Sequence, residues 1–160
     1  MTGEAHWWLV LLAIATTVDG LLAGASLDQS IEQLPARHRI GVRAYSEYSR
    51  ASHVGNGRFW LIPLGIGGAV LTLAAAIWAL KLNLPGYRSL PMFLAGGLAI
   101  AHTLSTVKAA SMNLIQWKTG TDDVALANVL DRFARWQALR ASLQFLTFAA
   151  SAWALAVNGY

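Results

Sequence analysis

Apolar residues along this 160-residue chain gather into four long runs that are almost free of charged side chains. The runs cover residues 7–27, 59–80, 90–109 and 136–157. A helix needs ~20 apolar residues, each rising about 1.5 Å, to cross a hydrocarbon core about 30 Å thick. The pattern therefore predicts an all-α fold, a four-helix transmembrane bundle in which residues 1–160 form one membrane domain.

Three polar connections join the runs, and the first is the longest. Residues 28–57 mix apolar side chains with arginines, which predicts an amphipathic cytoplasmic helix at the membrane interface. We expect Pro35 to break this helix near its start, and Gly55-Asn56-Gly57 to turn the chain into the second span. The second connection, at 83–86, contains the Pro-Gly pair of a short turn. In the third, Asp122 is expected to cap a helix that can continue into the last span.

Lysine and arginine residues predict the orientation of the bundle. Two of them, Lys81 and Arg88, border the second connection, whereas nine border the first and the third. Cytoplasmic segments of membrane proteins carry an excess of these residues. We therefore expect an inner or plasma membrane protein with the first and third connections in the cytoplasm and both termini outside. The nine residues are Arg37, Arg39, Arg43, Arg50, Arg58, Lys108, Lys118, Arg132 and Arg135.

The first run has two further features. Ala23-Gly24-Ala25 resembles a signal-peptide cleavage site, but the leader before Trp7 contains Glu4 and no lysine or arginine. A retained first helix is therefore the better interpretation. Gly20 and Gly24 form a small-residue pair, which predicts close approach of a neighbouring helix.

Composition narrows the chemistry that the chain can perform. It is 56% hydrophobic and 12% charged, against about 25% charged in soluble domains. The net charge of +4 is more consistent with membrane topology than with nucleic acid, for which we expect no role. The absence of cysteine rules out thiol catalysis and thiolate metal sites. The four histidines are scattered without metal-ligand spacing, so we expect no metal and no cofactor.

Four polar side chains fall inside the spans and are the main indication of function. Counting from the predicted cytoplasmic ends places Asp19, His102, Arg140 and Gln144 in one layer, ~7–13 Å deep. We expect them to face inward and contact one another, because an isolated charge in lipid is costly. His102 or Asp19 is a candidate base, and Arg140 a candidate positive charge for an oxyanion. Alternatively, Asp19 and Arg140 form a structural pair and His102 is an ordinary buried histidine.

Helical spacing adds neighbours to this layer. Arg140 and Gln144 are four residues apart, with Trp136 and Phe133 one and two turns earlier. On the third span, Thr106 and Asn113 share the face of the candidate histidine. We expect these side chains to bind substrate, with the two aromatic residues as a wall for a flat ligand. The alternative is that both aromatic residues anchor the helix at the membrane interface.

Several short motifs occur in a particular order along the chain. They are Gly-Leu-Leu-Ala-Gly at 20–24, Gln33-Leu34-Pro35, the 55–57 turn, Met112-Asn113, and Phe133 seven residues before Arg140. In order and spacing the chain resembles the DUF1772 family of four-span membrane proteins, which includes anthrone oxygenases. The resemblance implies oxygenase-like chemistry, without a cofactor, on a small lipophilic aromatic substrate. It is consistent with His102, Arg140 and Asp19 as catalytic residues, and with Gln144, Asn113, Trp136, Phe133 and Thr106 as substrate-binding residues.

Two other classes of protein remain open. One is a non-catalytic bundle that binds a lipid, a quinone or a partner membrane protein, and that can form a homo-oligomer. In this class the polar layer would only hold the helices together. The second class is a proton-coupled transporter, and the lack of an inverted repeat makes it the weaker interpretation.

Overall fold

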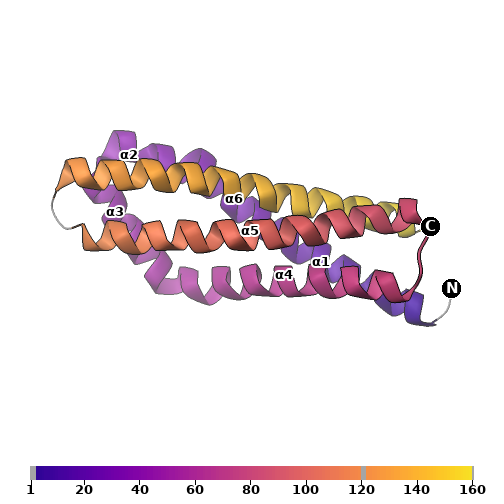
Figure 1. Cartoon of the computed structure of the whole chain (residues 1–160). Coiled ribbons are helices and arrows are strands. Elements are labelled where there is room, and N and C mark those ends of the chain that lie inside the picture. The colour runs from indigo at the N-terminus through magenta and orange to yellow at the C-terminus, as the bar shows by residue number, and fades with distance from the viewer. Residues whose placement is uncertain (1–2, 120–121, 160) are drawn as a thin grey trace.

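Four long helices lie side by side in the computed structural model, which describes residues 3–119 and 122–159 (Figure 1). They are α1 (Gly3–Asp28), α4 (Arg58–Lys81), α5 (Gly86–Lys118) and α6 (Asp123–Asn158). Four helical segments are long and apolar enough to cross a membrane, which confirms the predicted all-α four-helix bundle. The chain ends and the α4–α5 turn lie at one end of the bundle (Figure 1). The last turns of α5 and the first turns of α6 lie at the other end, beside α2 and α3.

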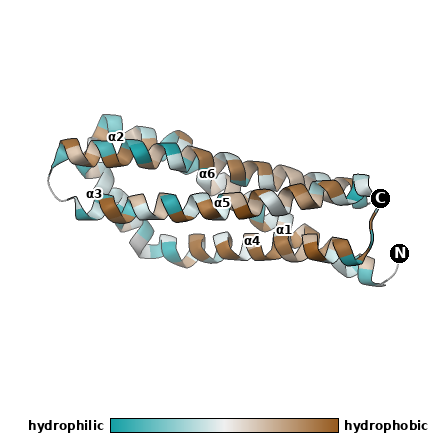
Figure 2. Ribbon diagram, in the orientation of Figure 1, coloured by the Kyte–Doolittle hydropathy of each residue, from teal (hydrophilic) through white to brown (hydrophobic). Residues whose placement is uncertain are grey.

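The last two helices are longer than a membrane requires. Helix α5 has 33 residues and α6 has 36, so both exceed the ~20 residues that span a bilayer. The excess length lies at the end with α2 and α3, where hydrophilic residues are more frequent than along α4 (Figure 2). The Asp122 side chain accepts hydrogen bonds from the backbone N–H groups of Val124 and Ala125, each at 3.0 Å. The predicted helix cap is confirmed, and this helix does continue through the last span.

The first connection continues the first helix before it turns back. A π-helical turn, η1 (Gln29–Gln33), leads without a break into α2 (Leu34–Ile40). The predicted break at Pro35 is wrong, because the π-helical turn η1 directly before it already departs from the α-helical hydrogen-bond pattern that a proline would interrupt. The chain breaks instead at Gly41, whose φ of 89° and ψ of 151° favour glycine.

After this break, α3 (Val42–Ser52) packs against the bundle. Leu34 and Tyr45 from the first connection are buried in an apolar cluster, and the remaining members come from α5 and α6. They are Ala109, Leu126, Leu130 and Phe133. Part of the apolar face that predicted a helix on the membrane surface is therefore used in contacts within the protein, whereas Ile31, Ile40 and Tyr48 stay exposed.

Two ion pairs lie beside this cluster. Arg37 binds Asp131 and Arg43 binds Asp123, each with a nitrogen–oxygen distance of 2.9 Å. Both carboxylates are exposed, so each pair contributes at most about 1 kcal/mol. The apolar cluster is the main contact that holds the first connection on α6.

The turns into and out of α4 follow the sequence prediction. In η2 (His53–Gly57), Gly55 has a non-helical ψ of −125°, which turns the chain into the second span. At the other end of α4, Asn83 has a φ of 49° in the short turn that precedes α5.

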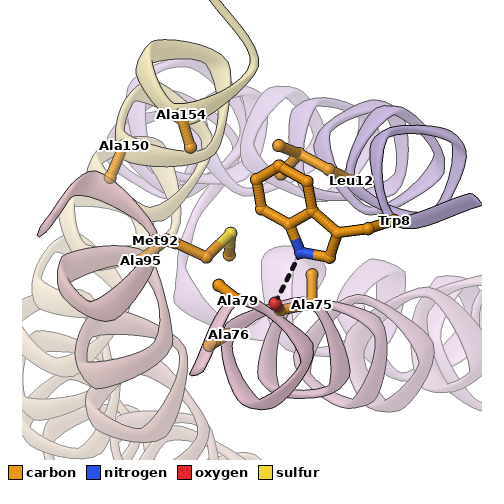
Figure 3. Packing of buried hydrophobic residues seen from close by; sticks show 9 residues of the cluster. All are labelled: Trp8, Leu12, Ala75, Ala76, Ala79, Met92, Ala95, Ala150 and Ala154. Carbon is orange, nitrogen blue, oxygen red and sulfur yellow. Dashed lines mark hydrogen bonds between the residues drawn. The ribbon is translucent and has the colours of Figure 1, made fainter. Parts of the chain in front are cut away.

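Small side chains allow close packing near the chain ends. Trp8 inserts among alanines of three helices, and its indole Nε1 donates a 2.9 Å hydrogen bond to the carbonyl oxygen of Ala75 (Figure 3). Gly20 faces the ring of Phe148, where an added Cβ would lie 3.0 Å from the ring. Gly24 has open space around it. The predicted small-residue pair therefore contributes one close contact.

Candidate functional site

Contacts between α1 and α6 fix the height of every polar group in the interior. Asp19 lies opposite Ser151, and Gln29 lies opposite Arg140. Along α6, Ser151 and Arg140 are ~16 Å apart. The predicted single layer is therefore wrong, because Asp19 lies about three turns away from Arg140. The prediction counted depth from Asp28 as the end of the first helix, whereas the helical path continues to Ile40.

Asp19 belongs to a separate cluster with Thr72 and Ser151, which we call the Asp19 cluster. Its Oδ2 atom accepts hydrogen bonds from the Thr72 hydroxyl at 2.8 Å and from the Ser151 hydroxyl at 3.1 Å. The side chain is 1% exposed and joins α1, α4 and α6. The predicted ion pair with Arg140 does not form among the described residues.

The second carboxylate oxygen of Asp19 explains a glycine on α4. Oδ1 has no hydrogen-bond partner in the described part of the chain. A Cβ at Gly68 would lie 3.0 Å from this oxygen, whereas a Cβ at Gly67 would meet nothing within 4 Å. Gly68 therefore leaves the space in which the carboxylate faces Thr72.

The Asp19 cluster lies within the apolar length of the helices, away from the charged residues at both ends of α4. Along α4, Thr72 is ~21 Å from Arg58 and ~14 Å from Lys81, the charged residues at the two ends of this helix. Because the Asp19 carboxylate has no access to water at this position, the hydroxyl groups of Thr72 and Ser151 are its main compensation for lost hydration.

A second group of polar side chains lies closer to the end with α2 and α3. Arg140 Nη2 donates a 2.8 Å hydrogen bond to the Oε1 atom of Gln29. The Nε2 atom of Gln29 lies 3.0 Å from His53 Nε2, and His53 Nδ1 lies 2.8 Å from the carbonyl oxygen of Ser49. A carbonyl only accepts, so Nδ1 carries the proton and neutral His53 accepts from Gln29 through Nε2.

The surroundings of His53 favour this neutral form. Burial lowers the pKa of His53 from its ordinary value of 6.5, and the nearby charge of Arg140 lowers it further. The hydrogen bond to the Ser49 carbonyl opposes both effects. The net shift keeps His53 uncharged beside the guanidinium.

His102 and Gln144 lie on the same side of the bundle as this guanidinium. Asn158 on α6 donates a hydrogen bond to the carbonyl oxygen of Arg88 on α5, and His102 and Gln144 each lie ~21 Å from this contact along these antiparallel helices, at the same height. Both side chains are buried, and the charge of Arg140 acts on His102. We call Gln29, His102, Arg140 and Gln144 the Arg140 layer.

Several polar atoms of the Arg140 layer have no hydrogen-bond partner among the described residues. They are His102 Nδ1, Arg140 Nε and Gln144 Oε1. In the same part of the chain, the ion pairs described above do not include Arg140. Within the described residues, the layer therefore contains a positive charge without a carboxylate partner, one unused donor and two further nitrogen and oxygen atoms without a hydrogen-bond partner.

The remaining predicted site residues are not brought together. Phe133 is fully buried in the apolar cluster beneath α2, whereas Trp136 is exposed on the outer side of α6. Thr106 donates to the carbonyl oxygen of His102 within α5. Asn113 accepts a 2.6 Å hydrogen bond from Gln116 and lies ~16 Å from His102 along α5. The predicted aromatic wall and the role of Asn113 do not fit this arrangement.

Sequence reasoning missed four residues that the structure places at these two sites. Gln29 and His53 lie in the segment interpreted as an amphipathic helix at the membrane interface, where polar residues are expected to face water and carry no signal of burial. Thr72 and Ser151 are hydroxyl residues within apolar runs, which was a usable signal for partners of Asp19.

Comparisons with protein-family models, with curated proteins and with solved structures found no match to this chain. Within the described residues, no three histidine, aspartate or glutamate side chains gather as a metal site would require. The resemblance noted in the sequence therefore stays a prediction.

The contact between Asp19 and Gly68 leads to a prediction for stability. In Gly68→Ala, the new methyl group should displace the carboxylate and weaken its bonds to Thr72 and Ser151, lowering the free energy of unfolding by about 1–2 kcal/mol. Gly67→Ala is the matched control, because its methyl group enters open space. Thermal midpoints in detergent measure both, and equal midpoints for the two variants would contradict this packing.

The lowered pKa of His53 leads to a prediction about pH. Below about pH 6.5 the unfolded chain binds a proton at His53 that the folded chain does not bind, so stability falls as the pH is lowered through this range. In His53→Gln this part of the dependence should disappear, giving a shallower fall in the thermal midpoint between pH 7 and pH 5. His38→Gln, at an exposed position on α2, is the control. An unchanged slope in His53→Gln would show that His53 does not have this role.

Proposed function

We propose that the chain is a membrane-embedded, oxygenase-like enzyme that binds a small lipophilic aromatic molecule through an oxygen atom in the Arg140 layer. One observation carries the proposal: Arg140 lies inside the bundle with no acidic partner among the described residues and with its Nε donor unused. A charge in this position is costly unless an anionic group compensates it. A ligand oxygen that becomes negative during reaction would provide that compensation.

The proposed chemistry uses two functional groups of the Arg140 layer, the imidazole of His102 and the guanidinium of Arg140. A methylene group between aromatic rings and conjugated to a ketone can lose a proton to His102, and its electron pair then moves to the ketone oxygen. Arg140 stabilises this oxyanion, an interaction that strengthens in a water-poor interior. The enolate carbon reacts with O₂, so that the methylene becomes a carbonyl and the second oxygen atom leaves as water. The enolate supplies the electrons, so the proposed reaction requires no redox cofactor.

The structure changes the role proposed for Asp19. Its distance from the Arg140 layer makes it unsuitable as the base, and both of its hydroxyl partners come from other helices. We assign it a structural role, and His102 becomes the single candidate base. Gln144 replaces Asn113 as the candidate group that orients the ligand, because it lies at the height of His102.

A second function is favoured by one specific observation. The Asp19 cluster shows that this bundle uses buried polar groups to join helices, and the Arg140–Gln29 bond can serve the same purpose. In this case the chain is a non-catalytic bundle that binds a lipid, a quinone or a partner membrane protein. The proposed orientation is the same for both functions: the end with α2 and α3 faces the cytoplasm, and both termini face outside.

Oxygen uptake by the purified protein with an anthrone tests the first proposal. His102→Ala and Arg140→Gln should each lower the rate by about 100-fold or more, as expected for loss of a base or of an oxyanion donor. Arg39→Gln, an exposed arginine on α2, should keep the wild-type rate. Gel filtration and the thermal midpoint show whether each variant is folded.

Two results would contradict the enzyme proposal. Folded wild type that consumes oxygen no faster than the spontaneous reaction would favour the binding function instead. Uptake at the full rate by folded His102→Ala would show that the reaction occurs at another site.

A further inference from the structure

A basic hollow on the outer side of α6 is not used by the proposed reaction. It has a volume of about 440 Å³ and is lined by Arg132, Arg135, Trp136 and Leu139. All four side chains are exposed, and they combine two guanidinium groups, an indole and an aliphatic group. The hollow therefore offers positive charge at one end and apolar surface at the other.

The two guanidinium groups of the hollow are available to a ligand. Neither Arg132 nor Arg135 has a hydrogen bond or an ion pair with another described residue. The nearest acidic residue in sequence, Asp131, is bound to Arg37 at 2.9 Å. Its negative charge is thus largely compensated, and the hollow keeps a net positive charge.

The hollow lies at the height of the membrane surface, as two independent comparisons indicate. The first comparison starts from Thr72 and Ser151, which lie at the same height because both contact Asp19. Measured from them in the same direction, Arg58 is ~21 Å away along α4 and Arg135 is ~24 Å away along α6. The basic residue that begins α4 therefore lies at nearly the same height as Arg135.

The second comparison uses the opposite end of the bundle. Asn158 donates a hydrogen bond to the carbonyl oxygen of Arg88. From this contact, Lys108 is ~30 Å away along α5 and Arg135 is ~35 Å away along α6. About 30 Å is the thickness of the hydrocarbon core, so these cations lie where lipid head groups begin.

We propose that this hollow binds the head group of an anionic phospholipid. Guanidinium groups form paired hydrogen bonds with phosphate oxygens, and a tryptophan is favoured at this depth of the membrane. Leu139 lies one turn closer to the membrane centre, where the acyl chains begin. The two arginines carry a charge of +2, which one phosphodiester compensates only in part. A head group with a net negative charge therefore binds better than a zwitterionic one.

The test measures lipid binding to the full chain purified in detergent. Native mass spectrometry with added phosphatidylglycerol gives the fraction of protein that carries one lipid. Arg132→Gln combined with Arg135→Gln should weaken this binding roughly 30-fold, from about 1 kcal/mol for each basic residue at the surface. The control double variant, Arg39→Gln with Lys118→Gln, removes the same charge from exposed positions elsewhere and should bind within about 2-fold of wild type.

Several outcomes would overturn the proposal. Equal binding of phosphatidylcholine and phosphatidylglycerol would exclude recognition of a negative head group. An equal loss in the control variant would mean that overall charge, and not the hollow, attracts the lipid. Competition by inorganic phosphate at the lipid concentration would identify a site for free phosphate. A change in oligomeric state of the Arg132/Arg135 variant would instead identify a contact between copies of this chain.

Discussion

Water is absent from the hydrocarbon core of a membrane, so a buried carboxylate on one of the four long helices must find its hydrogen-bond donors within the protein. Asp19 meets this requirement between three helices, where hydroxyl groups from α4 and α6 both donate to one of its oxygen atoms. Such a contact joins three helices at one height. It thereby sets the position of α1 against its neighbours, and the heights of all other polar groups follow from it.

The continuation of α1 beyond Asp28 has the largest consequence for function. Because the helical path runs on through η1 and α2, Gln29 reaches Arg140, and His53 returns to the same place after the chain reverses at Gly41. The first connection thus completes a site that the spans alone would leave open. Its apolar residues pack on the ends of α5 and α6, so the segment positions Gln29 and His53 while it covers the bundle.

Much of the fold follows from local patterns in the sequence. The four apolar runs, the glycine turn before α4, the Pro-Gly turn before α5 and the Asp122 cap depend on the residues next to them, and each prediction is confirmed. The effect of Pro35 was misjudged because the cost of a proline in a helix depends on the hydrogen-bond pattern of the turn before it, and the sequence did not show that this turn is π-helical.

The site was less predictable because it depends on register between helices. Sequence spacing correctly placed Arg140 and Gln144 on one side of α6, but it did not show that Asp19 faces Thr72 and Ser151. An error of a few residues in the end of one helix moves a side chain by a full turn or more. Aromatic residues were also ambiguous, since Phe133 and Trp136 lie three positions apart and yet one is buried and the other exposed.

A double-mutant cycle between Asp19→Asn and Arg140→Gln tests the separation of the two polar sites most directly. The free energy of unfolding in detergent is measured for the wild type, both single variants and the double variant. Because the two side chains lie on different layers, their effects should add to within about 0.5 kcal/mol. The same cycle between Gln29→Ala and Arg140→Gln should show coupling, since these two residues share a hydrogen bond. Rescue of Asp19→Asn by Arg140→Gln, with a coupling of about 1 kcal/mol or more, would contradict the arrangement described here.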